Sequence, residues 1–181
     1  MRAKSRRGDK SNMPGHFPYL VRILDWSSDY HFAMNPREAE TEPFWEYRAI
    51  SLVGEIIAPF LPKVETTDVM LWPEHFLEPE DRARAEPQAI GHMTARAGKM
   101  GVNLYMPSSA WAPLLTALAA GKFRYVSWSG DKLKYGRGRV GSFSLDYETT
   151  DESLREINEI WAIDKKPTRK TPAKGNKKPV S

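Results

Sequence analysis

The sequence predicts a mainly β protein: an antiparallel β-sandwich or a half-open barrel, with one inserted helix and one C-terminal amphipathic helix. Three observations support this class. About seven short runs rich in β-branched and aromatic residues follow one another with little helix between them. Helical spacing of apolar residues occurs once before the last two runs and once after them. Apolar residues make up 40% of the 181 residues, enough for a packed core without the disulfides that the absence of Cys excludes.

Five runs in the first part of the chain are predicted strands: residues 19–26, 44–57, 65–72, 89–95 and 102–106. The run 44–57 alternates over most of its length, which predicts a long strand with a bend near Gly54. The last two of these runs form a hairpin whose connection holds Gly98 and Gly101. Residues 78–87 predict a short helical turn that Pro79 opens and Pro87 ends.

The second part of the chain predicts a helix, a hairpin and a closing helix. The inserted helix covers about residues 109–120, with Ser109 as its N-cap and Gly121 at its end. Residues 122–128 and 132–147 form a hairpin around the turn 129–131. The closing helix runs from Asp151 to Ile163, preceded by Thr149 and Glu152 at the spacing of a capping box.

A single β domain, residues 16–148, is followed by the helix at 149–163. The flanking segments 1–15 and 164–181 are basic and short of large apolar residues, so we predict that both are disordered. They also account for the pI near 9.2. Residues 1–10 hold five cations and one acid and residues 164–181 hold seven cations and one acid, which leaves residues 11–163 with a net charge of −6.

Charge is also divided within the domain. Twelve acids and four cations lie from Glu38 to Glu86, whereas eight cations and one acid lie from Arg96 to Arg139. Local potential governs docking more than net charge does. The acidic segment therefore favours a basic partner, and the basic segment favours an anionic one.

The hairpin predicted after the inserted helix mixes cations with aromatic residues, a composition typical of sites for single-stranded nucleic acid. The candidate nucleic-acid-binding residues are Lys122, Arg124, Lys132, Lys134, Tyr135, Arg137 and Arg139. In a regular strand, Arg137 and Arg139 share a face with the apolar Phe143, which would make this an ordinary solvated hairpin. A bulge at one of the glycines would reverse that phase.

Residues 136–141 match the pattern Gly-x-Gly-x-x-Gly of dinucleotide-binding folds. In those folds the motif leaves a strand and opens a helix. Here an alternating run follows it, so we interpret the glycines as relief of crowding in a bent or bulged strand.

We expect no metal site, no cofactor and no catalytic residue from the motifs. The sequence has no Gly-x-Ser-x-Gly turn. An oxygen-rich metal site can be drawn from Glu74, His75, Glu78 and Asp81, but the prolines around these residues favour an exposed acidic loop. A small hydrolase-like enzyme remains a third hypothesis, and it requires a cleft that gathers His31 or His92 with two acids.

The expected function is that of a non-enzymatic binding or accessory protein whose partner is another protein, because long strands such as 44–57 offer edges for strand addition. The alternative is a nucleic-acid-binding protein that uses the hairpin 122–139 and the basic tails. The tails attract phosphate without reading sequence, or serve solubility alone. No apolar run reaches the ~20 residues of a membrane helix and no hydrophobic stretch follows the basic start, so we expect a cytoplasmic location. The oligomeric state stays open.

Overall fold

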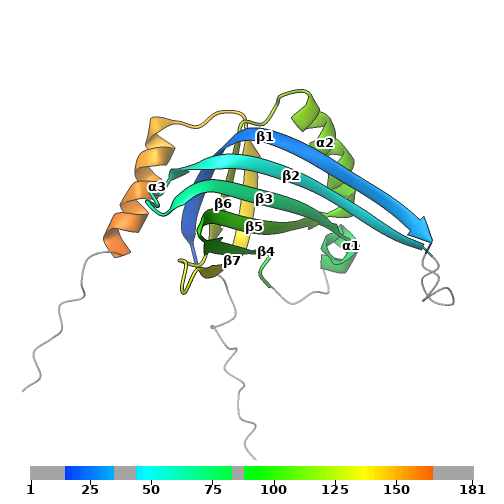
Figure 1. The fold of residues 1–181 in the computed structure, drawn as a ribbon, viewed down its shortest axis with the longest axis horizontal. Helices are drawn as coiled ribbons and strands as arrows, with labels where there is room; N and C mark the ends of the chain where they lie inside the picture. The colour runs from blue at the N-terminus through cyan, green and yellow to red at the C-terminus, as the bar shows by residue number, and fades with distance from the viewer. Residues whose placement is uncertain (1–14, 35–43, 83–87, 165–181) are drawn as a thin grey trace, which may run out of the picture.

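Seven strands and three helices make up the part of the chain that the computed structural model describes, residues 15–34, 44–82 and 88–164 (Figure 1). The strands are β1 (Phe17–Met34), β2 (Phe44–Ala58), β3 (Val64–Glu74), β4 (Gly91–Arg96), β5 (Gly98–Pro107), β6 (Tyr125–Gly130) and β7 (Arg137–Asp146). The helices are α1 (Pro79–Arg82), α2 (Trp111–Ala119) and α3 (Asp151–Asp164). Short 3₁₀ turns, His75–Leu77 and Ser108–Ala110, precede α1 and α2.

The strands form a closed barrel in the order β1-β2-β3-β5-β4-β7-β6. All neighbours are antiparallel apart from β3 and β5, which run parallel. The predicted mainly β fold, with an inserted helix and a C-terminal helix, is confirmed. Of the two predicted architectures the barrel is found, and it closes fully because β1 pairs with β2 on one side and with β6 on the other.

The barrel interior is filled by apolar side chains from all seven strands. Tyr19 and Trp128 are fully or almost fully buried and stack with their ring centroids 5.3 Å apart. The other buried strand residues of this core are Val21, Ile50, Leu52, Val69, Leu71, Met93, Met100, Val102, Leu104, Met106, Val126 and Val140. Burial of this set is the main stabilising contribution to the fold.

Helix α3 belongs to the same core. The ring of Trp161 packs edge-on against Tyr19 at 5.2 Å and lies 5.1 Å from the ring of Phe17. Its indole N–H donates to the backbone carbonyl of Pro18 at 2.8 Å. The predicted amphipathic helix therefore packs on the barrel and contributes Trp161 to its core.

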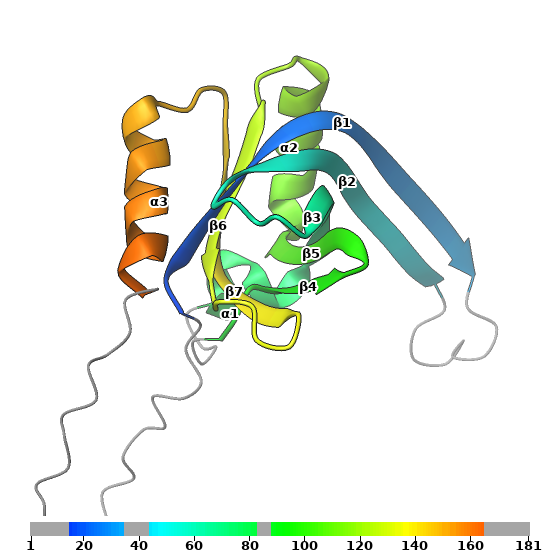
Figure 2. The same ribbon diagram turned by 60° about the vertical axis from the view of Figure 1, so that its left-hand side comes forward.

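Strands β1 and β2 extend beyond the barrel as a two-stranded ribbon, which we call the hairpin arm (Asp29–Met34 and Phe44–Ala49). Figures 1 and 2 show it projecting on the side away from α3. The run predicted to end at Trp26 continues to Met34. Residues 27–31 are mostly polar in the sequence, but here they form strand because they pair with residues 47–51 of β2.

Both sequence-predicted helix caps differ in detail from the structure. Ser109 does not cap α2 through its own side chain; instead its amide and hydroxyl each donate to the carboxylate of Glu78 at 2.8 Å. Those hydrogen bonds hold the pKa of Glu78 below its ordinary value, and the bond from the Ser109 amide has the larger effect. At α3, Thr150 rather than Thr149 accepts the capping bond, from the amide of Ser153 at 3.1 Å.

The predicted bend at Gly54 has a steric reason. A Cβ there would collide with the backbone of Arg22 and the side chain of Val21 on the paired strand, so close approach of β1 and β2 requires glycine. Apart from Gly15 and Asp164, the tails predicted to be disordered lie outside the described residues, as does Pro87. Gly15 is hydrogen-bonded to Asp131 and Asp164 is the last residue of α3. Within the described part, no helix is long and apolar enough to cross a membrane.

Candidate functional site

The structure divides the seven predicted nucleic-acid-binding residues into two groups. Lys122 and Arg124 precede β6, and Arg124 lies over the ring of Tyr147 at 5.0 Å. The other five follow β6 at its far end. A strand of six residues is about 20 Å long, so the first pair does not join the rest in one site.

A bulge decides where Arg137 and Arg139 point. Val140 pairs with Gly130 and Ser142 pairs with Ser129, so Gly141 is an extra residue in β7. Val140 is buried on the inner side, which places Arg137 and Arg139 on the outer side. The phase reversal that the sequence left open is therefore present, and it separates the arginines from Phe143.

Asp131 holds Arg139 in place. Its carboxylate accepts hydrogen bonds from Nε of Arg139 at 2.9 Å, from the Arg139 amide at 3.1 Å and from the Gly15 amide at 2.7 Å. Partial burial raises the pKa of Asp131, but these hydrogen bonds outweigh it and keep the pKa below its ordinary value. The contact ties the start of the described chain to the β6–β7 connection.

The turn between β6 and β7 explains part of the glycine motif. Tyr135 and Gly136 both have positive φ, 53° and 73°, as a tight hairpin turn from Lys134 to Arg137 requires. A Cβ on Gly136 would also lie 2.6 Å from the carbonyl oxygen of Ala95. These observations fit the structural interpretation of the motif.

Sequence analysis missed two cations that complete this region. Arg96 and Lys99 are directly paired across the β4–β5 hairpin, and both are exposed. Thr94 on β4 pairs with Arg137 on β7, which places Arg96 diagonally next to Arg137. We call this outer region the basic face; it consists of Arg96, Lys99, Lys134, Tyr135, Arg137 and Arg139. These residues come from three strands and the turn before β7, and the sequence does not show that β4 lies between β5 and β7. The basic face was therefore not predictable from the sequence.

A chain of hydrogen bonds runs along the outer side of β3, β5 and β4. The indole N–H of Trp72 donates to Oδ1 of Asn103 at 2.9 Å, and Nδ2 of Asn103 lies 3.2 Å from Nε2 of His92. With Oδ1 accepting, Nδ2 donates and His92 accepts through Nε2. These contacts link His92 to an amide rather than to two acids.

The hairpin arm is apolar on both faces. Met34 is 68% exposed and Tyr30 60% exposed, and Phe32, Phe44 and Trp45 are also exposed. Each face has a ring contact between the two strands. The ring centroids of Phe32 and Phe44 lie 5.4 Å apart on one face, and those of His31 and Trp45 lie 4.8 Å apart on the other. A cluster of this kind on a protein surface is typical of an interaction site.

The arm leaves the outer edges of both its strands unpaired: in the described part of the chain, β1 pairs with β6 only from Phe17 to Arg22. The β2 edge is the one that borders a cleft. In the described part of the chain, β3 pairs with β2 from Ile50 to Gly54 and not with Phe44–Ala49. β3 instead stays with β5 to its end and contains Pro73, which has no N–H to donate. The outer half of β2 therefore presents unpaired backbone groups.

A cleft of about 480 Å³ lies beside this free edge. One wall is β2 from Phe44 to Arg48, and the other is formed by residues 72–75 with Ser108. Tyr47 and Trp72 meet edge-on at 5.4 Å, at the point where β2 and β3 separate. Backbone donors and acceptors, aromatic walls and an open strand edge thus occur together.

Arg48 braces the base of the arm. Its guanidinium lies 5.8 Å from the ring centroid of Trp111 at the start of α2 and 3.4 Å from the carboxylate of Glu46. The ring of Tyr30 lies 6.5 Å from the same indole. Because Arg48 and Glu46 pair with each other, the carboxylate of Glu74 gives the cleft its acidic character.

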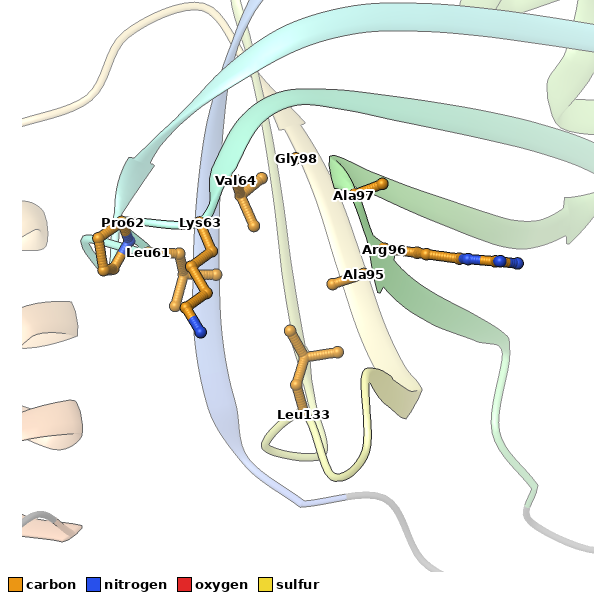
Figure 3. Close-up of a pocket in the computed structure, with 9 residues that line it drawn as sticks. All are labelled: Leu61, Pro62, Lys63, Val64, Ala95, Arg96, Ala97, Gly98 and Leu133. Carbon is orange, nitrogen blue, oxygen red and sulfur yellow. The ribbon is translucent and has the colours of Figure 1, made fainter.

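A second hollow, of about 460 Å³, opens at the end of the barrel near the β4–β5 turn (Figure 3). Leu61, Val64 and Leu133 extend into it, whereas Arg96 extends away from it. Its lining carries no carboxylate, hydroxyl or imidazole group. Lys63 and Arg96 are the charged residues of this lining.

The residues considered for a metal site do not gather into one in the described part of the chain. The described residues contain no group of three or more His, Asp or Glu side chains placed to hold a metal ion. His31 lies against Trp45, and the Glu78 carboxylate is bonded to Ser109.

Comparison with known proteins adds no relative. No protein-family model, no curated protein and no solved structure matches this chain.

Proposed function

We propose that this protein is a non-enzymatic binding protein that captures an extended segment of a partner protein at the free edge of β2 in the hairpin arm. The observation that carries the proposal is the coincidence of the unpaired edge, Phe44–Ala49, with the aromatic cleft beside it. A segment added there would pair with β2 and lie in the cleft against Trp72 and Pro73.

The backbone of the edge provides the affinity common to all such ligands. Six residues of strand extend over about 20 Å, and half of their N–H and C=O groups already pair with β1. The other half point to the free side, where an incoming strand satisfies them. Main-chain pairing of this kind is insensitive to the partner's sequence.

The cleft provides the selectivity. Aromatic side chains from both walls, among them Trp45, Tyr47 and Trp72, form surfaces for the apolar side chains of the added strand. Glu74 favours lysine or arginine in the added strand, while Glu46 and Arg48 pair with each other. Since side chains of a strand alternate between two faces, the preferred segment alternates apolar and basic residues.

Selection from a phage-displayed library of random dodecapeptides on the full-length protein tests this proposal. We expect enriched peptides that alternate apolar with basic residues. Trp45→Ser should weaken their binding at least tenfold because it removes one aromatic wall. The matched control is Val53→Ser, an exposed residue on the same outer face of β2 but outside the cleft, which should leave binding unchanged.

Hydrogen exchange with the best peptide bound localises the contact. The amides of residues 44–49 that face the free edge should become protected, and a proline-substituted version of the peptide should lose both binding and protection. Enriched peptides that bind the Trp45→Ser variant equally well would contradict the proposal.

Sedimentation of the protein alone separates a foreign partner from a second copy of the chain. A monomer agrees with the proposal. A dimer that Trp45→Ser dissociates would instead assign the free edge to self-association.

A further inference from the structure

We propose that the basic face binds single-stranded nucleic acid, with phosphates held by Arg96, Lys99 and Arg137 and one base stacked on Tyr135. The hairpin arm takes no part in this second site. The inference is therefore independent of the peptide-binding proposal.

Tyr135 is the observation that points to a ligand. Its φ of 53° lies in the left-handed region, where Gly and Asn are favoured and a bulky residue is strained. Tyr135 is 95% exposed, so no burial of its side chain offsets the backbone strain. Its ring contact within the described chain is with the neighbouring Lys134 ammonium, at 5.8 Å. An aromatic ring that is fully accessible at a strained turn is suited to stacking on an unpaired base.

Three cations near Tyr135 form no ion pair among the described residues, whereas Arg139 is paired with Asp131. The three are Arg96, Lys99 and Arg137. Like charges directly opposite each other on neighbouring strands, as with Arg96 and Lys99, destabilise a sheet. A phosphate bound between Arg96 and Lys99 would offset that repulsion, which remains when no anion is bound.

The three cations form a line across the sheet. Lys99 on β5 is opposite Arg96 on β4, and Arg96 is diagonal to Arg137 on β7. Neighbouring strands lie about 4.8 Å apart, so the line crosses three strands at close spacing. Arg96 extends away from the apolar hollow to the outer side, as Figure 3 shows. A flexible phosphate backbone can follow this line while a base reaches the Tyr135 ring at the adjacent turn.

Asp131 does not neutralise this line. Its carboxylate bonds to Arg139 and to the backbone of Gly15. The carboxylate of Glu65 on β3 lies near Gly98 at the β4–β5 turn, but among the described residues it forms no ion pair with Arg96 or Lys99.

A surface that binds an anionic membrane needs several exposed apolar side chains to insert among the lipids. Of the six residues of the basic face, five are cations and one, Tyr135, is a large exposed hydrophobic residue. The chemistry favours a nucleic acid over a lipid surface.

Fluorescence anisotropy with a labelled 20-nucleotide oligo-dT, and with a duplex of the same length, tests the proposal on the full-length protein over a salt series. The test pair is Arg96→Glu with Arg137→Glu. The control pair is Lys122→Glu with Arg124→Glu, which makes the same change in net charge at the far end of β6 and leaves both tails intact. Circular dichroism confirms folding, and the glutamine versions R96Q and R137Q replace the glutamates if the fold is disturbed.

We expect the test pair to weaken binding of the single strand at least tenfold more than the control pair does. The slope of log affinity against log salt should become shallower by about 1 to 2, as for two lost phosphate contacts. Tyr135→Asn, which suits the left-handed backbone and removes the ring, should lower single-strand affinity about fivefold or more and leave duplex affinity unchanged.

Equal losses from both charge-reversed pairs would overturn the proposal, because binding would then follow net charge and the tails. An unchanged affinity of Tyr135→Asn would overturn the stacking role. Vesicles of phosphatidylcholine with phosphatidylserine provide the competing surface. Vesicle binding that depends on Arg96 and Arg137, with no such dependence for oligo-dT, would assign the face to membranes instead.

Discussion

The two halves of the β1–β2 hairpin share the same strands but have opposite surroundings. In the barrel half, Val21 and Leu52 face inward and are almost completely buried, because β3 and β6 close the sheet on either side. In the arm half, Tyr30 and Phe32 are equally apolar yet more than half exposed. Apolar composition therefore accompanies burial in one half and exposure in the other.

The arm also contrasts with the basic face. The arm leaves backbone hydrogen-bonding groups and aromatic surface available, whereas β4, the central strand of the basic face, is paired on both edges and leaves charge available. Binding at the arm should accordingly depend weakly on salt, and binding at the basic face steeply. The same barrel thus presents two surfaces of different chemistry.

The largest expected effect comes from the barrel half. Leu52→Ala should lower the free energy of unfolding by about 2–5 kcal/mol, because it leaves a cavity among fully buried neighbours. Urea denaturation followed by tryptophan fluorescence measures this change. A loss below about 1 kcal/mol would mean that the barrel half is no better packed than the arm.

The next effect concerns the anchor of β1 at the start of its barrel half. Asp131→Asn should cost about 1–2 kcal/mol, since it weakens charge-assisted hydrogen bonds to Gly15 and Arg139. The wild-type carboxylate has a lowered pKa, so it stabilises the fold above the ordinary aspartate pKa of about 3.9 and loses that contribution as the pH falls through the lower folded value. Unfolding at pH 7, 4 and 3 should show the two proteins converging. A constant difference would assign the cost to packing.

A smaller effect is expected at the junction of the two halves. Arg48→Met keeps the apolar stem but removes the charge that lies over Trp111, at a cost of about 0.5–1 kcal/mol. Hydrogen exchange should accelerate in residues 44–49 and stay unchanged in the barrel strands. Uniform acceleration throughout the sheet would show that the arm and the barrel unfold as one unit.

The smallest effect belongs to the arm. Phe32→Ser should change the free energy of unfolding by no more than about 0.5 kcal/mol, because the side chain is exposed and its stacking on Phe44 is a surface contact. The same urea titration as for Leu52→Ala provides the measurement. A cost comparable to Leu52→Ala would place Phe32 in a core and remove the contrast between the two halves.

The sequence by itself determined the elements and the composition of the surfaces. Alternation predicted the long strand 44–57, helical spacing predicted the helix at 151–163, and both lie within one residue of the observed bounds. The grouping of acids before residue 87 and of cations after residue 95 was also visible. These properties depend on neighbours a few positions away, which a linear pattern records.

Only the tertiary structure decided which of these groups meet. Closure of the barrel placed β4 between β5 and β7 and so joined Arg96 and Lys99 to Arg137, while Lys122 and Arg124 were left apart. The bulge at Gly141 set the phase of β7, and departure of β3 from β2 opened the arm edge. Glu78 reached Ser109 across 31 positions. Strand pairing and bulges are fixed by contacts between distant segments, so no local pattern in the chain specifies them.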